Sequence, residues 1–161
     1  MIIGFTHNGH NTGIAAKLTQ WFTMQPYTHC ELFLEPHSLA LSARTDGIGV
    51  SLKPAKEVLQ KSTVWEFWCV PTSDQQALNT WALAQVGKRY DYADIARLFS
   101  PVSVKFSDSW FCSELCYVAA RDFGKIHIQR VSADLVHPGL LHQLLIKAGA
   151  EKIDAYPSLT A

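Results

Sequence analysis

The hydrophobic pattern of this 161-residue chain changes in character near Ser73. Before Ser73, short stretches rich in β-branched and aromatic residues are separated by turn residues, which is typical of antiparallel strands. After Ser73, apolar residues recur at helical spacing. Strands grouped early and helices grouped late favour an α+β fold, with an antiparallel sheet packed against helices, over alternating βαβ units. No repeat or long linker divides the chain, so we expect a single domain over 1–161.

The elements follow from this pattern. We expect a first amphipathic helix over 14–22, and we expect the sheet to be complete after its last long strand, which ends before Pro71. Strands are predicted over 2–5, 29–34, 39–43, 49–52 and 63–70. Later helices are predicted from a cap at Ser73 to Gly87, over 91–99, over 111–123, and from Pro138 to Gly149.

Charge and hydropathy exclude two classes of partner. Lysine plus arginine and aspartate plus glutamate each number 14, so the net charge is zero and no nucleic-acid partner is expected. No charge-free run is apolar enough for a membrane span, and the N-terminus lacks the pattern of a secretory signal. We therefore expect no integral membrane segment. The expected location is cytoplasmic by default, with a phage-associated or exported location as alternatives.

The four cysteines, Cys30, Cys69, Cys112 and Cys116, form no Cys-x-x-Cys pair. Their spacing therefore favours neither a disulfide framework nor a zinc ribbon. Cys112 and Cys116 share a helix face and, with a histidine, make a zinc site geometrically possible, but no second ligand pair has the usual spacing. We expect no metal and no cofactor.

Two segments combine reactive and apolar residues, 27–34 and 109–116. Alternation along the first, a strand, places His29 and Glu31 on one face. In the second, Asp108 or Ser109 can cap a helix whose first turns contain Cys112, where unpaired backbone N–H groups stabilise a thiolate. Cys112, His29 and Glu31 could form a nucleophile, base and orienting group. Each residue also has a structural interpretation, because free cysteines are commonly buried as small hydrophobic residues and a lone histidine is usually structural.

Three motifs occur in order between residues 27 and 116. They are Tyr27-Thr-His-Cys-Glu-Leu32, Gly87-Lys-Arg-Tyr-Asp91 and Trp110-Phe-Cys-Ser-Glu-Leu115. This order resembles the circularly permuted branch of the NlpC-type papain-like superfamily, which includes the YiiX-like proteins and, more distantly, lecithin:retinol acyltransferase. In that branch the histidine strand precedes the cysteine helix. The resemblance implies a papain-like fold in which Cys112 attacks a carbonyl carbon and His29 transfers the proton.

The resemblance leaves two candidates for the residue that orients His29. Relatives place a polar residue at the start of the next strand, near Ser42, but serine orients an imidazole poorly, so Glu31 is ranked first and Ser42 second. Tyr90 resembles a tyrosine beside the nucleophile whose hydroxyl helps the backbone N–H of Cys112 to bind an oxyanion. Tyr90 is otherwise a core aromatic with a satisfied hydroxyl.

The thiol at a helix start and the His29/Glu31 strand face predict a cysteine hydrolase, a peptidase or amidase, that cleaves a small peptide through a thioacyl-enzyme. The resemblance implies that this peptide is of the cell-wall type. One alternative is a thioesterase or acyltransferase acting on lipid acyl groups, which a hydrophobic groove beside Cys112 would favour. The other is a non-catalytic binding module on the same fold, which a cysteine without a histidine in reach would favour.

Overall fold

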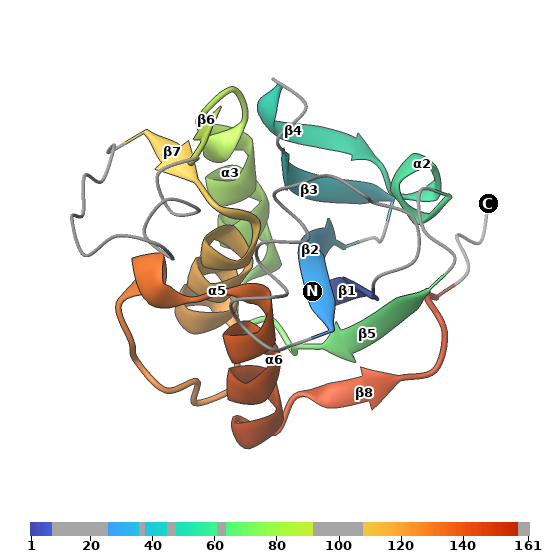
Figure 1. The fold of residues 1–161 in the computed structure, drawn as a ribbon, viewed down its shortest axis with the longest axis vertical. Helices are drawn as coiled ribbons and strands as arrows, with labels where there is room; N and C mark the ends of the chain where they lie inside the picture. The colour runs from blue at the N-terminus through green and yellow to red at the C-terminus, as the bar shows by residue number, and fades with distance from the viewer. Residues whose placement is uncertain (8–25, 36–37, 45–47, 61–63, 92–107, 158–161) are drawn as a thin grey trace.

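The computed structural model describes residues 1–7, 26–35, 38–44, 48–60, 64–91 and 108–157 (Figure 1). Within them, an antiparallel sheet has the spatial order β4-β3-β2-β1-β5-β8. Its strands are β1 (Ile2–His7), β2 (Tyr27–Leu34), β3 (Leu39–Arg44), β4 (Gly49–Pro54), β5 (Trp65–Cys69) and β8 (Glu151–Ile153). Helices pack against this sheet, so the predicted α+β class is confirmed.

The two faces of the sheet are covered by different helices, as Figure 1 shows. The larger core lies under α3 (Gln75–Gln85), α5 (Cys112–Phe123) and α6 (Pro138–Lys147), and it includes Phe5 and Leu32. The opposite face holds a smaller cluster around Phe33, which the short helix α2 (Ala55–Leu59) covers with Ala55 and Val58. Neighbouring residues of β2 thus enter opposite cores, as strand alternation predicts.

Two elements of the sheet region differ from expectation. The prediction that the sheet ends with the fifth strand was wrong, because β8 pairs antiparallel with β5. Glu151 and Lys152 make up most of β8, and a charged segment this short carries no strand pattern in the sequence. The short helix α2, which follows Pro54 directly, was not expected. The predicted helices over 14–22 and 91–99, apart from Asp91, lie outside the described residues.

The start of α3 lies one residue later than predicted. Asp74 caps this helix, with its Oδ1 accepting a hydrogen bond of 2.9 Å from the backbone N–H of Ala77. Ser73, the expected cap, instead donates its hydroxyl to the carbonyl oxygen of Phe123 at 2.9 Å. The contact ties the start of α3 to the end of α5, so a tertiary hydrogen bond has displaced the local one.

A small second sheet leads into α5. Its two strands, β6 (Arg89–Tyr90) and β7 (Ser109–Trp110), pair in parallel. The loop before β6 is fixed to β4, because the N–H of Val50 donates to the carbonyl of Lys88 at 2.8 Å. Gly49 permits this approach: its φ is +72°, and a Cβ there would overlap the carbonyl oxygen of Lys88. The main sheet therefore positions the segment that precedes the cysteine helix.

Candidate active site

Cys112 is the first residue of α5. The predicted caps of this helix are wrong: Phe111 occupies the cap position in extended conformation, and no side chain caps the helix in the part of the chain that the structure describes. Ser109 lies in β7 and donates its hydroxyl to Oδ2 of Asp91 at 2.8 Å, in a buried contact. This bond secures β7 against the segment after β6, and the helix starts where β7 ends.

The histidine strand meets this helix where β2 is not paired with β3. The two strands are in register only from Leu32 to Leu34, opposite Leu41 to Leu39. The earlier part of β2, which contains His29, is therefore not hydrogen-bonded to β3, and α5 packs against β2. The backbone N–H of Cys30 donates a hydrogen bond to the sulfur of Cys112. The start of α5 therefore packs against the part of β2 that is not paired with β3.

The structure brings Cys112, His29 and Glu31 together in a row. Nε2 of His29 lies 3.0 Å from Oε1 of Glu31, and His29 also hydrogen-bonds the side chain of Cys112. Because Nε2 faces the carboxylate, Nδ1 is the ring nitrogen left for the sulfur. The side chain of Glu31 is 0% exposed and that of His29 is 19% exposed, while Cys112 is 1% exposed. The imidazole therefore lies between a thiol and a fully buried carboxylate.

The charges of this row favour a thiolate and an imidazolium. Burial alone would raise the pKa of the Cys112 thiol, but hydrogen bonds from Cys30 and the charge of His29 hold it well below its usual value. Burial alone would lower the pKa of His29, but the Cys112 sulfur and the Glu31 carboxylate outweigh it and raise that pKa to about 10. Between these two pKa values the site holds a thiolate and an imidazolium.

Cys30 contacts both Cys112 and Cys116. Burial, followed by hydrogen bonds to Cys112 and Cys116, raises the pKa of the Cys30 thiol well above its usual value. Cys116 is buried in the larger core, one turn after Cys112. Cys30 therefore acts as a neutral thiol donor to Cys112, which is the cysteine paired with a histidine.

Ser42 is not hydrogen-bonded to His29, whereas Tyr90 lies beside the residue that precedes Cys112. Ser42 is buried in β3, and its Oγ has no hydrogen-bond partner among the described residues. The contact to His29 is made by Glu31, so of the two predicted orienting residues only Glu31 bonds the imidazole. Tyr90 is half-buried, and its ring centroid lies 5.7 Å from that of Phe111, the residue before Cys112. The tyrosine thus lies beside the start of α5.

Arg44 is a further member of this site that was not predicted. Its Nη1 lies 3.4 Å from Oε1 of Glu31, the same oxygen that faces His29. Arg44 ends β3, and continuing the β2–β3 register beyond Leu41 places it on the sheet face of Glu31. The signal in the sequence was a single charged residue at the end of an apolar strand next to the histidine strand.

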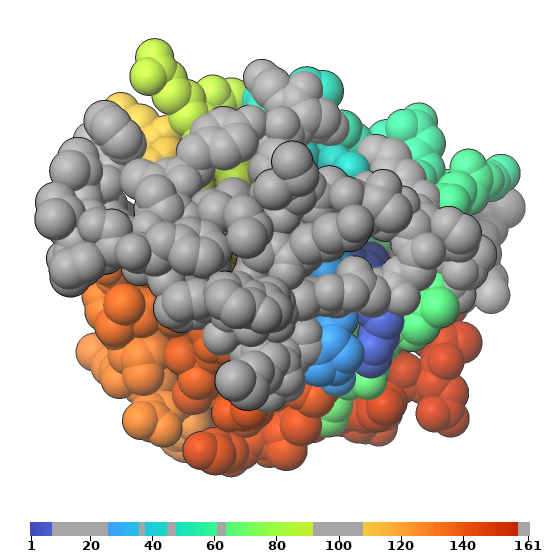
Figure 2. Space-filling model, in the orientation of Figure 1, coloured from blue at the N-terminus to red at the C-terminus, as the bar shows by residue number. Residues whose placement is uncertain are grey.

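A second polar cluster surrounds Glu66 on β5. Nε2 of His142 lies 2.6 Å from Oε1 of Glu66, and the indole N–H of Trp68 donates to that oxygen at 2.7 Å. Nζ of Lys152 lies 3.2 Å from Oε2, and the hydroxyl of Tyr27 lies 2.9 Å from His142. In Figure 2, atoms of β1 and β2 reach the surface beside the C-terminal segments. The cluster joins β2, β5, α6 and β8.

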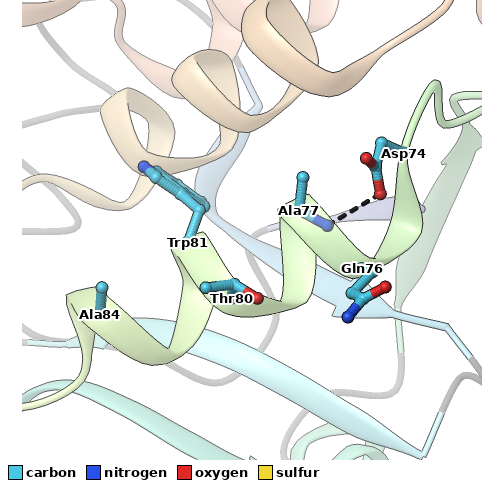
Figure 3. A pocket seen from close by; sticks show the side chains of 6 residues that line it. All are labelled: Asp74, Gln76, Ala77, Thr80, Trp81 and Ala84. Atoms are coloured by element: carbon cyan, nitrogen blue, oxygen red, sulfur yellow. Dashed lines mark hydrogen bonds between the residues drawn. The ribbon is translucent and has the colours of Figure 1, made fainter.

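A hollow on the surface of α3 does not border Cys112. It has a volume of about 500 Å³ and follows the outer face of α3, lined by Asp74, Gln76, Ala77, Thr80, Trp81 and Ala84 (Figure 3). None of Cys112, His29 and Glu31 borders it. Among the residues that the structure describes, no three His, Cys, Asp or Glu side chains are grouped as a metal site would require. Within the same residues, no helix combines the length and apolarity needed to cross a membrane.

Comparison with known proteins gives no family for this chain: no protein-family model matches it, and no curated protein matches it significantly in sequence.

Proposed function

We propose that this protein is a cysteine hydrolase of the papain-like type, with Cys112 as nucleophile, His29 as acid and base, and Glu31 as the residue that orients His29. The observation that carries the proposal is the continuous row from the Cys112 sulfur through the imidazole to Oε1 of Glu31. A thiol paired with an imidazole, itself held by a third polar group, is the arrangement that nucleophilic catalysis by cysteine requires.

In the proposed reaction, the Cys112 thiolate attacks the carbonyl carbon of an amide. The new S–C bond forms while the carbonyl electron pair moves to oxygen. Because Cys112 is the first residue of α5, its backbone N–H has no partner within the helix and is available to that oxyanion. The hydroxyl of Tyr90 is the proposed second donor. Collapse of this intermediate breaks the C–N bond, and the His29 imidazolium gives its proton to the departing amine.

Hydrolysis of the thioacyl-enzyme completes the proposed cycle. The neutral imidazole of His29 takes a proton from water, and the resulting hydroxide attacks the thioester carbonyl. The C–S bond then breaks, releasing a carboxylic acid and restoring the thiolate and imidazolium. Glu31 keeps the ring in the tautomer that presents Nδ1 to the sulfur. The substrate class that we propose is a small peptide of the cell-wall type, and the proposed fold is the circularly permuted NlpC-type arrangement.

The proposal is tested by the state and reactivity of Cys112. The ultraviolet absorbance of the thiolate, taken as the difference between the wild type and Cys112→Ser, measures the ionisation of Cys112. This measurement works even though the side chain is buried. Alkylation at about pH 6, mapped by mass spectrometry, reads nucleophilicity. We expect a thiolate at that pH and labelling confined to Cys112, both lost in His29→Ala. Cys69→Ala, on β5, is the matched control and should change neither.

An ordinary thiol midpoint of about 8.5 that does not change in His29→Ala would overturn the catalytic row and favour a binding module. The substrate is tested with peptide amides and acyl thioesters offered to the same enzyme. Amide cleavage that is lost in Cys112→Ser supports the proposal. Turnover of acyl thioesters alone would assign an acyl-transfer or thioesterase reaction instead.

A further inference from the structure

The carboxylate that holds His29 is shared with a second cation. Oε1 of Glu31 lies 3.0 Å from Nε2 of His29 and 3.4 Å from Nη1 of Arg44. The Glu31 side chain is 0% exposed, whereas the Arg44 side chain is 21% exposed. The other carboxylate oxygen, Oε2, has no hydrogen-bond partner among the described residues. Both described polar contacts of this buried carboxylate therefore go to Oε1, one from protonated His29 and one from Arg44.

A buried carboxylate is costly to keep ionised unless a positive group stays beside it. His29 cannot be that permanent partner, because the proposed reaction removes its proton in one step and restores it in another. Arginine keeps its charge at every pH at which proteins are folded. When His29 is neutral, Arg44 is the remaining cation in contact with Glu31 among the described residues.

We propose that Arg44 is a positioning residue of this site, the permanent counter-cation that stays beside the Glu31 carboxylate and holds it against His29 throughout the reaction. The inference rests on the proposed function, since it assigns Arg44 a part in the same row. Arg44 touches neither the sulfur nor the substrate in this assignment. It acts through Glu31, and Glu31 acts through His29.

Within the part of the chain that the structure describes, the charged and titratable groups of this row come from three elements. Strand β2 contributes His29, Cys30 and Glu31, β3 contributes Arg44, and α5 contributes Cys112 and Cys116. Strand β1 places Thr6 and Gly4 opposite His29 and Glu31, and neither residue titrates. When Arg44 is counted with the row, its four charged groups are a thiolate, an imidazolium, a carboxylate and a guanidinium. Their charges sum to zero.

Replacing Arg44 with an uncharged residue leaves the row with a net negative charge. The row then binds a proton more readily, so the thiolate should disappear at a higher pH than in the wild type. Arg44 lies at the far end of the row from the Cys112 sulfur. Removing a unit charge there, in a medium of effective dielectric constant near 20, should raise the midpoint of the thiol by roughly one pH unit. A residue that only packs against β2 would lower the rate at every pH and leave the midpoint unchanged.

The experiment compares Arg44→Met with the wild type by ultraviolet titration of the thiolate, with Cys112→Ser subtracted from each. The acid limb of kcat/KM, measured on a cleaved peptide, is the second readout. Arg44→Lys restores the charge and should bring both midpoints back to within a few tenths of a pH unit. Arg44→Gln is a second neutral variant for the case in which the methionine variant does not fold.

Arg121→Met is the matched control. Its guanidinium also pairs with a carboxylate, Nε lying 2.6 Å from Oδ1 of Asp122, but it lies nine residues after Cys112 on α5, roughly 13 Å along the helix. We expect this variant to leave both midpoints unchanged.

The outcomes separate the two proposals. An upward shift in the neutral Arg44 variants, reversed by lysine and absent in the control, supports the role of Arg44. A low wild-type midpoint that does not move in the neutral variants overturns that role and leaves the cysteine hydrolase standing. An ordinary wild-type thiol midpoint overturns the proposed function itself, and the role of Arg44 with it.

Discussion

Replacing Glu66 with glutamine should remove a stabilisation that depends on pH. Burial alone would raise the pKa of this carboxyl, but hydrogen bonds from His142, Trp68 and Lys152 outweigh it and lower the pKa from 4.5 to about 2. The side chain is 13% exposed, so solvent screens these contacts little. A pKa lowered in the folded state contributes stability that is present above the unfolded-state value and is lost as the pH falls toward the folded-state value. The relevant window is therefore between about pH 5 and about pH 2.

The size of the effect follows from the difference in pKa. A shift of this size corresponds to about 3 kcal/mol of unfolding free energy at neutral pH. Glu66→Gln keeps the shape of the side chain and removes its charge. We expect the stability difference between the wild type and Glu66→Gln to shrink by about 3 kcal/mol between pH 5 and pH 2. Any cost of mismatched hydrogen bonds adds an offset that does not vary with pH.

Urea unfolding at several pH values across this window measures that difference directly. Subtracting the variant from the wild type cancels the pH dependence of the cysteine site, provided that the two sites are independent. Glu57→Gln, at an exposed position on α2, is the matched control and should give a difference that is small at all pH values. A Glu66 difference that stays constant from pH 5 to pH 2 would refute the reasoning, because it would show that the cluster does not stabilise the ionised carboxylate.

Three further results are expected. Gly49→Ala should lower the unfolding free energy by about 2 kcal/mol or more in urea, because φ is +72° there and the new methyl group would overlap the carbonyl oxygen of Lys88; an unchanged midpoint would contradict the close approach. Ser109→Ala should cost about 1 to 3 kcal/mol, because the buried carboxylate of Asp91 loses a donor, and Ser109→Thr, which keeps the hydroxyl, should recover part of that loss. The phenol of Tyr27 should ionise near pH 12, because burial first and the Glu66 charge second raise its pKa; in an absorbance titration, Glu66→Gln should lower that midpoint.

The local part of the candidate site could be predicted from the sequence. Strand geometry places residues two apart on one face, so the contact between His29 and Glu31 follows from alternation alone. The two side chains extend toward each other, so that Nε2 of His29 lies 3.0 Å from Oε1 of Glu31. The contact of His29 with Cys112 joins segments more than eighty residues apart, and no periodicity encodes such a contact. Motif order alone suggested it, and the catalytic roles of these residues stay predictions.

The misplaced helix caps and the missed arginine have one physical cause, which is that tertiary contacts decide where these side chains bond. Ser109 was a suitable helix cap by sequence, but Asp91 engages its hydroxyl and β7 occupies its backbone. Ser73 was likewise displaced as a cap by its bond to Phe123. Arg44 was missed because its partner lies on the neighbouring strand, and register between strands cannot be read from one segment. The α+β class depended on periodicity summed over the chain, so these local differences left it intact.

The two outer strands of the sheet also bear on how this protein behaves at high concentration. A free strand edge invites pairing with another chain, and natural sheets limit this with short strands, charges or covering segments. Strand β8 is three residues long and presents exposed Glu151 and Lys152. At the other edge, the backbone of Val50 is hydrogen-bonded to Gly87 and Lys88, so part of β4 has no groups left for a neighbour. The loop that positions the cysteine helix therefore also occupies part of the β4 edge, while β8 limits the other edge by its shortness and its charges.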